Sequence, residues 1–203
     1  MDILGSLPVT RQKNKYIFKV IDQFTKWLEC YPIPNQAEET VATVLIDGFI
    51  ARLGCPLELH TDQGRNMDGH LVRQICRILQ IKKTRTTPYH SASNDQVEIY
   101  NNLILQTIRC FIKRQHNRWY EHVQLLAAAI CETPNRQTGF SASFLMFGRE
   151  VTQPIDLTFG LLTINTQEKE TFHLVQDIIT TLILVHGVAR DNLKSAQQRQ
   201  KKD

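Results

Sequence analysis

The sequence lacks an apolar run long enough to span a lipid bilayer. Its longest apolar stretch, residues 178–189, is interrupted by two threonines, a histidine and a glycine. A transmembrane helix needs about 20 consecutive apolar residues, so we expect no membrane partner. The N-terminus shows no secretory signal, and we therefore predict an intracellular chain.

Cysteine is sparse, and no two cysteines are spaced as C-x-x-C. The five cysteines fall inside apolar periodic segments, which is typical of small core residues in a reducing compartment. They are Cys30, Cys55, Cys76, Cys110 and Cys131.

Net positive charge is small outside the C-terminal tail. The formal net charge is +4, of which residues 190–203 carry +3. The net charge of about +1 on residues 1–189 gives weak support for nucleic-acid binding. A DNA-binding surface would therefore have to be a local basic patch. With 42% hydrophobic residues over 203 positions, the chain is long and apolar enough for one domain with a core and an appendage.

What the sequence does contain is an alternation of strand-like and helix-like segments. Residues 16–21 predict a strand, because they are mostly β-branched and aromatic. Residues 1–4, which end at Gly5, and residues 27–33, which Pro32 and Pro34 stop, predict a strand on either side of it along the chain. Lys19 lies in the middle of the second segment. Since buried strands rarely carry lysine, we expect this side chain on an open face or near a sheet edge.

A helix is predicted over residues 35–53. Asn35 and Glu38 have the spacing of a capping box, an apolar stripe follows them, and Gly54 is expected to end the helix.

Two further strands are predicted over residues 57–60 and 81–86. Between them, we expect Asp68 to cap a helix that turns Leu71, Ile75 and Ile78 inward.

More helices follow along the chain. Asn94 is the expected N-cap of a helix that carries Glu98 in its first turn. Residues 119–131 predict another apolar helix, with residues 140–147 as its partner segment. This order of elements is typical of an α/β layer fold, although the pattern alone does not distinguish one α/β fold from another.

The tail has its own periodicity from about residue 168. Apolar residues recur every three or four positions, which predicts a long amphipathic helix: Leu174, Ile178, Leu182, Val185, Ala189, Leu193 and Ala196. Two interpretations stay open, a helix that packs on the core or on a second chain, and a coiled-coil linker.

Three acids stand out by their positions. Asp2 belongs to the first strand, Asp62 follows a strand in the loop His60–Gly64, and 35 residues separate Asp62 from Glu98. Each acid has an ordinary alternative role. Asp62 could be a turn residue, Glu98 could be a partner of the helix dipole, and Asp2 alone is uninformative.

Together with their flanking residues, these acids resemble the D,D-35-E signature of retroviral and retrotransposon integrases. The stretches are D-I-L-G at Asp2, H-T-D-Q-G-R-N at Asp62 and P-Y-H-S-A-S-N-D-Q-V-E at Glu98. Other stretches are similar to the integrase core of gypsy-type LTR retrotransposons: Lys15–Ile17, Phe24–Trp27, Thr84–Tyr89, Thr138–Phe140 and Leu145–Glu150.

The resemblance implies an RNase H-like fold over residues 1–160, a mixed five-stranded sheet flanked by helices, with residues 161–203 as a helical extension. It also implies a polynucleotidyl transferase for DNA integration. Asp2, Asp62 and Glu98 would be its catalytic residues and the ligands of two Mg²⁺ or Mn²⁺ ions. Such ions prefer oxygen ligands, and a pair of them activates the attacking oxygen and stabilises the leaving oxygen.

Basic and aromatic residues near the acids are candidates for DNA contact: Arg65, Lys82, Lys83, Arg85 and Tyr89. A solvated strand end is the alternative for the cations, and core packing is the alternative for Tyr89. His60 and His90 lack the companion ligands of a zinc site, so we interpret them as scaffold.

The sequence departs from the family pattern around Glu98. The usual loop is H-P-Q-S-N-G, and here Asp95 replaces the glycine. The family continues with R-x-N-R, whereas Ile99 and Asn102 replace the arginines. Because lost cations weaken attraction to DNA phosphates, a degenerate or host-retained core with impaired activity is a second hypothesis.

Three functions therefore stay open. The first is a metal-dependent integrase core that acts on DNA, with a homodimer as a possible assembly. The second is a catalytically impaired DNA- or protein-binding domain, and the third is an RNase H-type nuclease, which the flanking motifs disfavour. Similar integrases carry an N-terminal zinc-binding and a C-terminal DNA-binding module that we do not find, so we expect a fragment, with a nuclear location.

Overall fold

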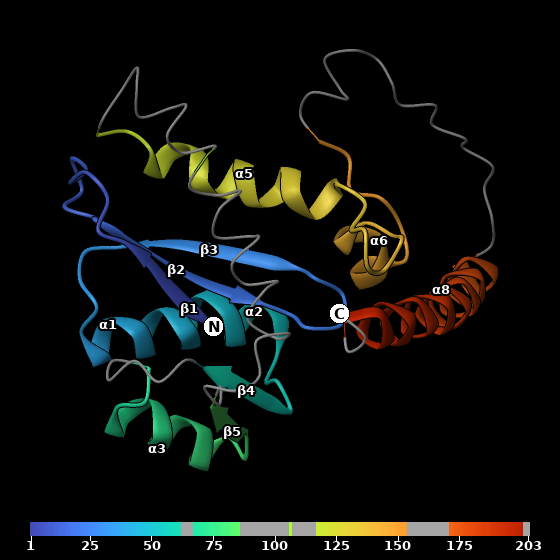
Figure 1. Cartoon of the computed structure of the whole chain (residues 1–203), viewed down its shortest axis with the longest axis horizontal. Coiled ribbons are helices and arrows are strands. Elements are labelled where there is room, and N and C mark those ends of the chain that lie inside the picture. The colour runs from blue at the N-terminus through green and yellow to red at the C-terminus, as the bar shows by residue number, and fades with distance from the viewer. Residues whose placement is uncertain (62–66, 86–105, 107–116, 154–170, 201–203) are drawn as a thin grey trace. The chain divides into compact units, whose positions relative to one another are not determined.

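The computed structural model describes residues 1–61, 67–85, 106, 117–153 and 171–200 (Figure 1). Its strands are β1 (Asp2–Gly5), β2 (Tyr16–Ile21), β3 (Leu28–Ile33), β4 (Glu58–Thr61) and β5 (Lys82–Arg85). Its helices are α1 (Glu38–Thr43), the π-helix η1 (Val44–Ile50), α2 (Ala51–Leu53), α3 (His70–Ile78), α5 (Tyr120–Glu132), α6 (Ala142–Phe147) and α8 (Thr171–Gln200). The predicted alternation is confirmed here, while the helix expected from Asn94 lies outside the described residues.

The chain packs as two compact units. The first comprises Met1–Ile21 and Leu28–Ala128, and the second comprises Asp22–Trp27 and Ala129–Asp203. The domain boundary predicted at residue 160 lies outside the described residues and stays a prediction. None of the described helices combines the length and the apolar character needed to cross a membrane.

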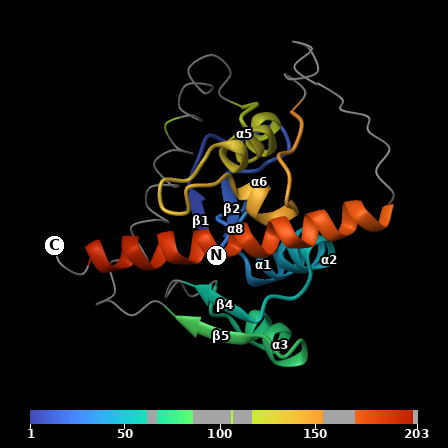
Figure 2. The ribbon, with the colours of Figure 1, turned by 90° about the vertical axis from the view of Figure 1, so that its right-hand side faces the viewer.

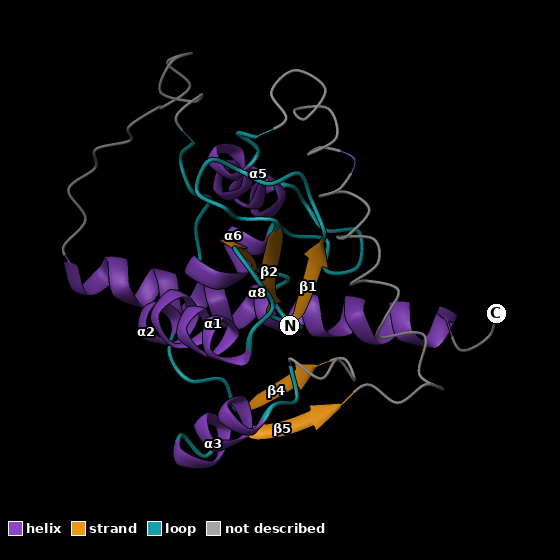
Figure 3. Ribbon diagram, turned by 90° about the vertical axis from the view of Figure 1, so that its left-hand side faces the viewer, coloured by secondary structure: helices purple, strands orange, loops and turns teal. Residues whose placement is uncertain are grey.

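The five strands of the first unit form two sheets (Figure 3). β1, β2 and β3 make an antiparallel meander, and β4 pairs in parallel with β5 through the crossover helix α3. The single five-stranded sheet that we predicted is not seen. β1 and β4 share no ladder among the described residues; the amino group of Met1 donates a hydrogen bond to the His60 carbonyl at 2.7 Å.

One apolar core nevertheless joins the two sheets. β2, β3, α1, η1, β4 and α3 contribute buried residues to a single cluster, together with Met67 before α3 and Ile81 before β5. Its members are Phe18, Val20, Ile33, Val41, Leu45, Phe49, Leu59, Met67, Val72, Cys76 and Ile81. Burial of this shared apolar surface is the main force that holds the first unit together.

The helix predicted over 35–53 is confirmed from Glu38, but its capping box is wrong. The Asn35 side chain accepts from the Ala37 amide at 2.8 Å, while the Glu38 carboxylate accepts from the Leu71 amide of α3. Gly69 makes this approach possible, because a Cβ there would collide with the Glu38 carboxylate. Glu38 thus stabilises the N-terminus of α3, where negative charge is favourable.

The buried face of α3 also differs from the prediction. Leu71 and Ile78 are exposed, whereas Val72, Ile75 and Cys76 are buried. Ile75 belongs to both possible stripes, one with Leu71 and Ile78 and one with Val72 and Cys76, so spacing alone did not decide between them. Packing in the shared core selects the second stripe.

The cysteines are mostly core residues, as predicted. Cys30, Cys76 and Cys131 are buried. Cys55 is exposed in the segment after Gly54, so its predicted burial is wrong. Cys110 lies outside the described residues.

The second unit is organised around α6 and α8. The Ser141 side chain caps α6 by accepting from the Phe144 amide at 3.0 Å, and Gly148 ends it with a φ of 70°. Trp27 packs edge-on against Phe147 at a centroid distance of 5.1 Å. Two stretches that we singled out for their family resemblance therefore lie together in this unit.

α8 is one uninterrupted helix (Figure 2). Its predicted stripe is confirmed from Ile178 onward: Ala189 is buried, and the other members, up to Ala196, are less exposed than most residues between them. The side chain of Leu174 lies outside the described residues. The helix contacts its own unit, since His186 Nε2 lies 2.8 Å from the Leu145 carbonyl and Asn192 donates to the Thr138 carbonyl at 2.8 Å. These contacts favour the packing interpretation.

A buried lysine lies in the turn of this second unit. Lys26 is 4% exposed, and its ammonium donates to the Gln23 carbonyl. Burial lowers the pKa of Lys26 to about 8, against the opposing influence of the Asp22 carboxylate.

Core packing predicts different costs for two neighbouring truncations in η1. Leu45 is 0% exposed and Ile46 is 39% exposed. We expect Leu45→Ala to reduce the free energy of unfolding by about 2–5 kcal/mol, because it opens a cavity in the shared core. Ile46→Ala is the matched control, with an expected loss below about 1 kcal/mol. Urea unfolding measures both, and equal losses would contradict the assigned core.

Lys26 predicts a rise of stability with pH. Because its folded-state pKa, about 8, lies below the unfolded value of about 10.4, the unfolded chain holds more protons between these values. The free energy of unfolding should therefore increase by about 2 kcal/mol over this interval. Lys26→Met should remove the rise, while the exposed-site control Lys82→Met should retain it. Parallel stability curves for wild type and Lys26→Met would contradict this assignment.

Candidate active site

Asp2 is the predicted catalytic acid that the structure describes; Asp62 and Glu98 lie outside the described residues. On β1, Asp2 Oδ1 accepts from the Ile3 amide at 2.7 Å. Its Oδ2 lies 3.0 Å from the Lys19 ammonium. The Asp2 side chain is 22% exposed and that of Lys19 is 1% exposed, so the pair combines a buried cation with a carboxylate that still reaches solvent.

The sheet register explains this pair. Asp2 is directly opposite Lys19 in the β1–β2 ladder, and opposed residues of antiparallel strands point to the same face. Our expectation that Lys19 lies on an open face or at an edge is therefore wrong: β2 is the central strand, and Lys19 is buried. A buried ammonium needs an opposite charge, which Asp2 supplies.

The end of β4 lies close to the start of β1. The amino group of Met1 bonds to the carbonyl of His60, and Asp62 follows Thr61, the last residue of β4. His60 Nδ1 lies 3.0 Å from the Thr84 hydroxyl. Burial, together with the charge of the chain's amino group, lowers the pKa of His60, so its neutral form is favoured and it acts as scaffold.

The donor chemistry of Asp2 fits a hard divalent cation. Its carboxylate supplies oxygen atoms, which Mg²⁺ and Mn²⁺ prefer, and it keeps partial access to solvent. Within the described residues no three His, Cys, Asp or Glu side chains gather into a metal-binding group. The remaining proposed ligands, Asp62 and Glu98, lie outside those residues.

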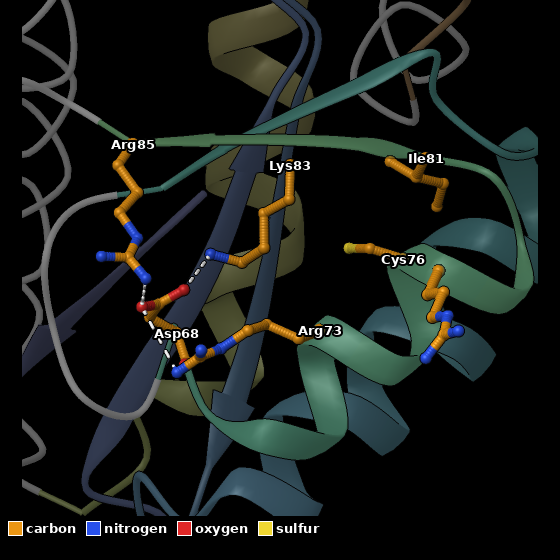
Figure 4. Close-up of a pocket in the computed structure, with 7 residues that line it drawn as sticks. Asp68, Arg73, Cys76, Ile81, Lys83 and Arg85 are labelled. Carbon is orange, nitrogen blue, oxygen red and sulfur yellow. Dashed lines mark hydrogen bonds and ion pairs between the residues drawn. The ribbon is translucent and has the colours of Figure 1, made fainter.

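A second cluster gathers around Asp68 (Figure 4). Lys83 contacts Asp68 Oδ1 at 2.7 Å, Arg73 lies 3.7 Å from Oδ2, and Arg85 is also paired with Oδ2. These residues line an open pocket of about 310 Å³ together with Cys76, Arg77 and Ile81. With four cations and one carboxylate, the pocket has an excess of positive charge.

The alternation of side chains along β5 explains which of the predicted cations line this pocket. Lys83 and Arg85 are two positions apart and share a face, whereas Lys82 points the other way and pairs with Glu58 at 3.2 Å. The bond from Lys83, followed by charge attraction to Lys83, Arg73 and Arg85, lowers the pKa of Asp68. Arg65 and Tyr89, our other DNA-contact candidates, lie outside the described residues.

Sequence reasoning missed Asp68, Arg73 and Arg77 as members of the basic pocket. We had assigned Asp68 a capping role, but the N-cap of α3 is Gly69. Arg73 and Arg77 are four residues apart on one helix face, and this spacing next to Lys83 and Arg85 was the available signal.

The Asp2–Lys19 pair predicts a stability penalty when the carboxylate is removed. With metal chelated, Asp2→Asn should lower the free energy of unfolding by about 1–3 kcal/mol, because it takes a carboxylate away from a buried ammonium. In a double-mutant cycle with Lys19→Met, the double variant should lose less stability than the sum of the two single losses, by at least about 1 kcal/mol.

Glu58→Gln provides the matched control for this cycle. Glu58 and Lys82 form an exposed ion pair, so their coupling should be much weaker. Urea unfolding of all variants makes the comparison. An additive Asp2–Lys19 cycle would show that the pair does not act as a unit.

The chain is similar to several known proteins. Residues 1–91 match the family described as "Integrase core domain". The chain is 27% identical over 154 residues to the retrovirus-related Pol polyprotein from transposon 412 of Drosophila melanogaster, covering 76% of this chain and 12% of that protein. It is 28% identical over 188 residues to the Gag-Pol polyprotein of avian reticuloendotheliosis virus, covering 91% and 16%. The chain thus spans a small part of these relatives.

Solved structures show the same fold. The catalytic core domain of BIV integrase has a TM-score of 0.56 at 18% identity, covering 71% of this chain and 91% of that one. The HTLV-2 integrase catalytic core domain in complex with magnesium has a TM-score of 0.53 at 16% identity, covering 68% and 97%. A chain in the simian T-cell lymphotropic virus intasome with the PP2A regulatory subunit B56 gamma has a TM-score of 0.60 at 16% identity, covering 75% and 55%.

These likenesses agree with the motifs around the three acids and with the α/β architecture. Residues 1–91 therefore match the integrase core domain, the chain is similar to the Pol polyproteins of retroviruses and retrotransposons, and its fold is that of integrase catalytic cores.

Proposed function

We propose that this chain is a polynucleotidyl transferase core for DNA integration, with Asp2, Asp62 and Glu98 as its catalytic carboxylates. The hydrogen bond between the Met1 amino group and the His60 carbonyl is the main supporting observation. It holds the start of β1, which carries Asp2, beside the end of β4, after which Asp62 follows.

The same contact supports a continuous sheet. We propose that β1 and β4 are adjacent strands of one five-stranded sheet with the order β3-β2-β1-β4-β5. The shared apolar core supports this order, because Phe18 of β2 and Leu59 of β4 belong to one buried cluster.

The carboxylates would hold two Mg²⁺ or Mn²⁺ ions. When bound, such ions activate an attacking water or 3′-hydroxyl and stabilise the leaving oxygen of a phosphodiester. The protein's contribution is to fix Asp2 through β1 and to orient His60 through Thr84. No nucleophilic side chain is required, so no covalent enzyme intermediate forms.

The basic pocket on α3 and β5 would contact DNA phosphates. Arg85 and Arg73 stay more than half exposed while paired with Asp68, so their guanidinium groups can also face a phosphate. In this proposal the chain derives from a gypsy-type element, acts on nuclear DNA and assembles with further copies, as the HTLV-2 integrase catalytic core domain does in its trimeric form.

An impaired core is the second candidate function. The Lys19–Asp2 ion pair favours it, because a cation already occupies one side of the first catalytic acid. Ile99 and Asn102 also favour an impaired core, because they replace the family's arginines and the lost positive charge weakens attraction to DNA phosphates.

A DNA joining assay tests the proposed function. Purified protein is incubated with a duplex bearing free 3′-hydroxyl ends and millimolar Mn²⁺, and nicked and joined products are quantified. We expect Asp62→Asn and Glu98→Gln each to reduce product about 100-fold or more, because each removes a metal ligand. Glu58→Gln, an exposed carboxylate on β4, should retain activity.

Two outcomes of this assay would count against the proposed function or its assigned acids. A wild-type chain that forms no product with either Mn²⁺ or Mg²⁺ would support the impaired candidate. Product that persists in Asp62→Asn would show that this acid is not part of the reaction centre.

A further inference from the structure

We infer that Lys19 is a built-in cation that competes with divalent metal for Asp2 and sets the metal affinity of this core. The inference rests on the proposed function, since it takes Asp2 as a metal ligand. It concerns a residue that the catalytic signature does not include.

Both oxygens of the Asp2 carboxylate are already engaged. Oδ1 accepts from the Ile3 amide at 2.7 Å, and Oδ2 lies 3.0 Å from the Lys19 ammonium. A carboxylate with these partners has less negative potential to offer an incoming cation. Metal binding at Asp2 therefore has to displace or tolerate a positive charge that is part of the fold.

Burial keeps Lys19 at this position. An exposed lysine can turn its ammonium into water when a metal ion arrives, as Lys82 can, because it is 72% exposed in its pair with Glu58. Lys19 is 1% exposed, and it lies on the central strand between Asp2 of β1 and Cys30 of β3. Its ammonium therefore cannot turn into solvent when a metal ion arrives, and separating a buried charge from its counter-charge is costly.

Two cations on one carboxylate repel each other at short range. The ammonium carries one charge and the metal two, and burial of Lys19 limits screening by water. The consequence is a site that binds metal weakly and gains affinity when the lysine is removed. The same ion pair stabilises β1 against β2, so fold stability and metal affinity are opposed at this position.

Isothermal titration calorimetry with MnCl₂ alone, without DNA, tests whether Lys19 weakens metal binding. We expect Lys19→Met to bind Mn²⁺ at least about tenfold more tightly than wild type, because Asp2 loses its competing cation. Lys19→Gln is a second, polar variant in case the methionine variant does not fold. The Mn²⁺-dependent rise in Tm should increase in the same order.

Three controls isolate the effect. Lys19→Arg keeps the charge and should bind as wild type does, and Lys82→Met removes an exposed charge and should also match wild type. Lys19→Met combined with Asp2→Asn should lose the gain. Equal Mn²⁺ affinity in wild type and in the folded Lys19→Met or Lys19→Gln variant would overturn the inference, whether both bind or neither does.

Failure of the inference and failure of the proposed function are separable. If Lys19→Met gains affinity while neither protein joins DNA, the inference stands and the transferase function falls. If wild type joins DNA in an Asp62-dependent reaction while Lys19→Met shows no gain in affinity, the function stands and the inference falls.

Discussion

A buried ammonium facing a carboxylate across β1 and β2 is the constraint on which the proposed site depends. Lys19 cannot remain in the core without an opposite charge, and Asp2 lies 3.0 Å away. A slip of one residue in this ladder would turn Lys19 and Asp2 to opposite faces. The ion pair therefore fixes the register of the first two strands, and with it the direction in which Asp2, the first proposed catalytic acid, points.

The remaining contacts position the second sheet relative to this pair. The shared apolar cluster packs β4 and β5 against the helix formed by α1, η1 and α2, while Glu38 binds the N-terminus of α3. The Met1–His60 hydrogen bond then brings the start of β1 to β4. In this arrangement the scaffold is specified by apolar burial and the site by a few polar contacts between strands.

Local patterns predicted the elements of this fold well. A β-branched and aromatic run marked β2, and three-to-four spacing marked the stripe of α8, since these signals depend on residues close in sequence. Contacts between elements were missed. Glu38 caps α3 instead of its own helix, Lys19 is buried because Asp2 lies opposite, and α3 turns Val72 inward instead of Leu71. The grouping of Asp2, Asp62 and Glu98 came from family resemblance, because spacing alone leaves each with an ordinary role.

The most direct measurement of the central claim is anomalous diffraction from crystals of this chain soaked in MnCl₂. The account predicts a manganese peak in contact with a carboxylate oxygen of Asp2, with Asp62 or Glu98 among its other ligands. It also predicts higher occupancy at the same concentration in Lys19→Met. A manganese peak confined to other carboxylates, with Asp2 bound to Lys19 alone at saturating metal, would contradict the account.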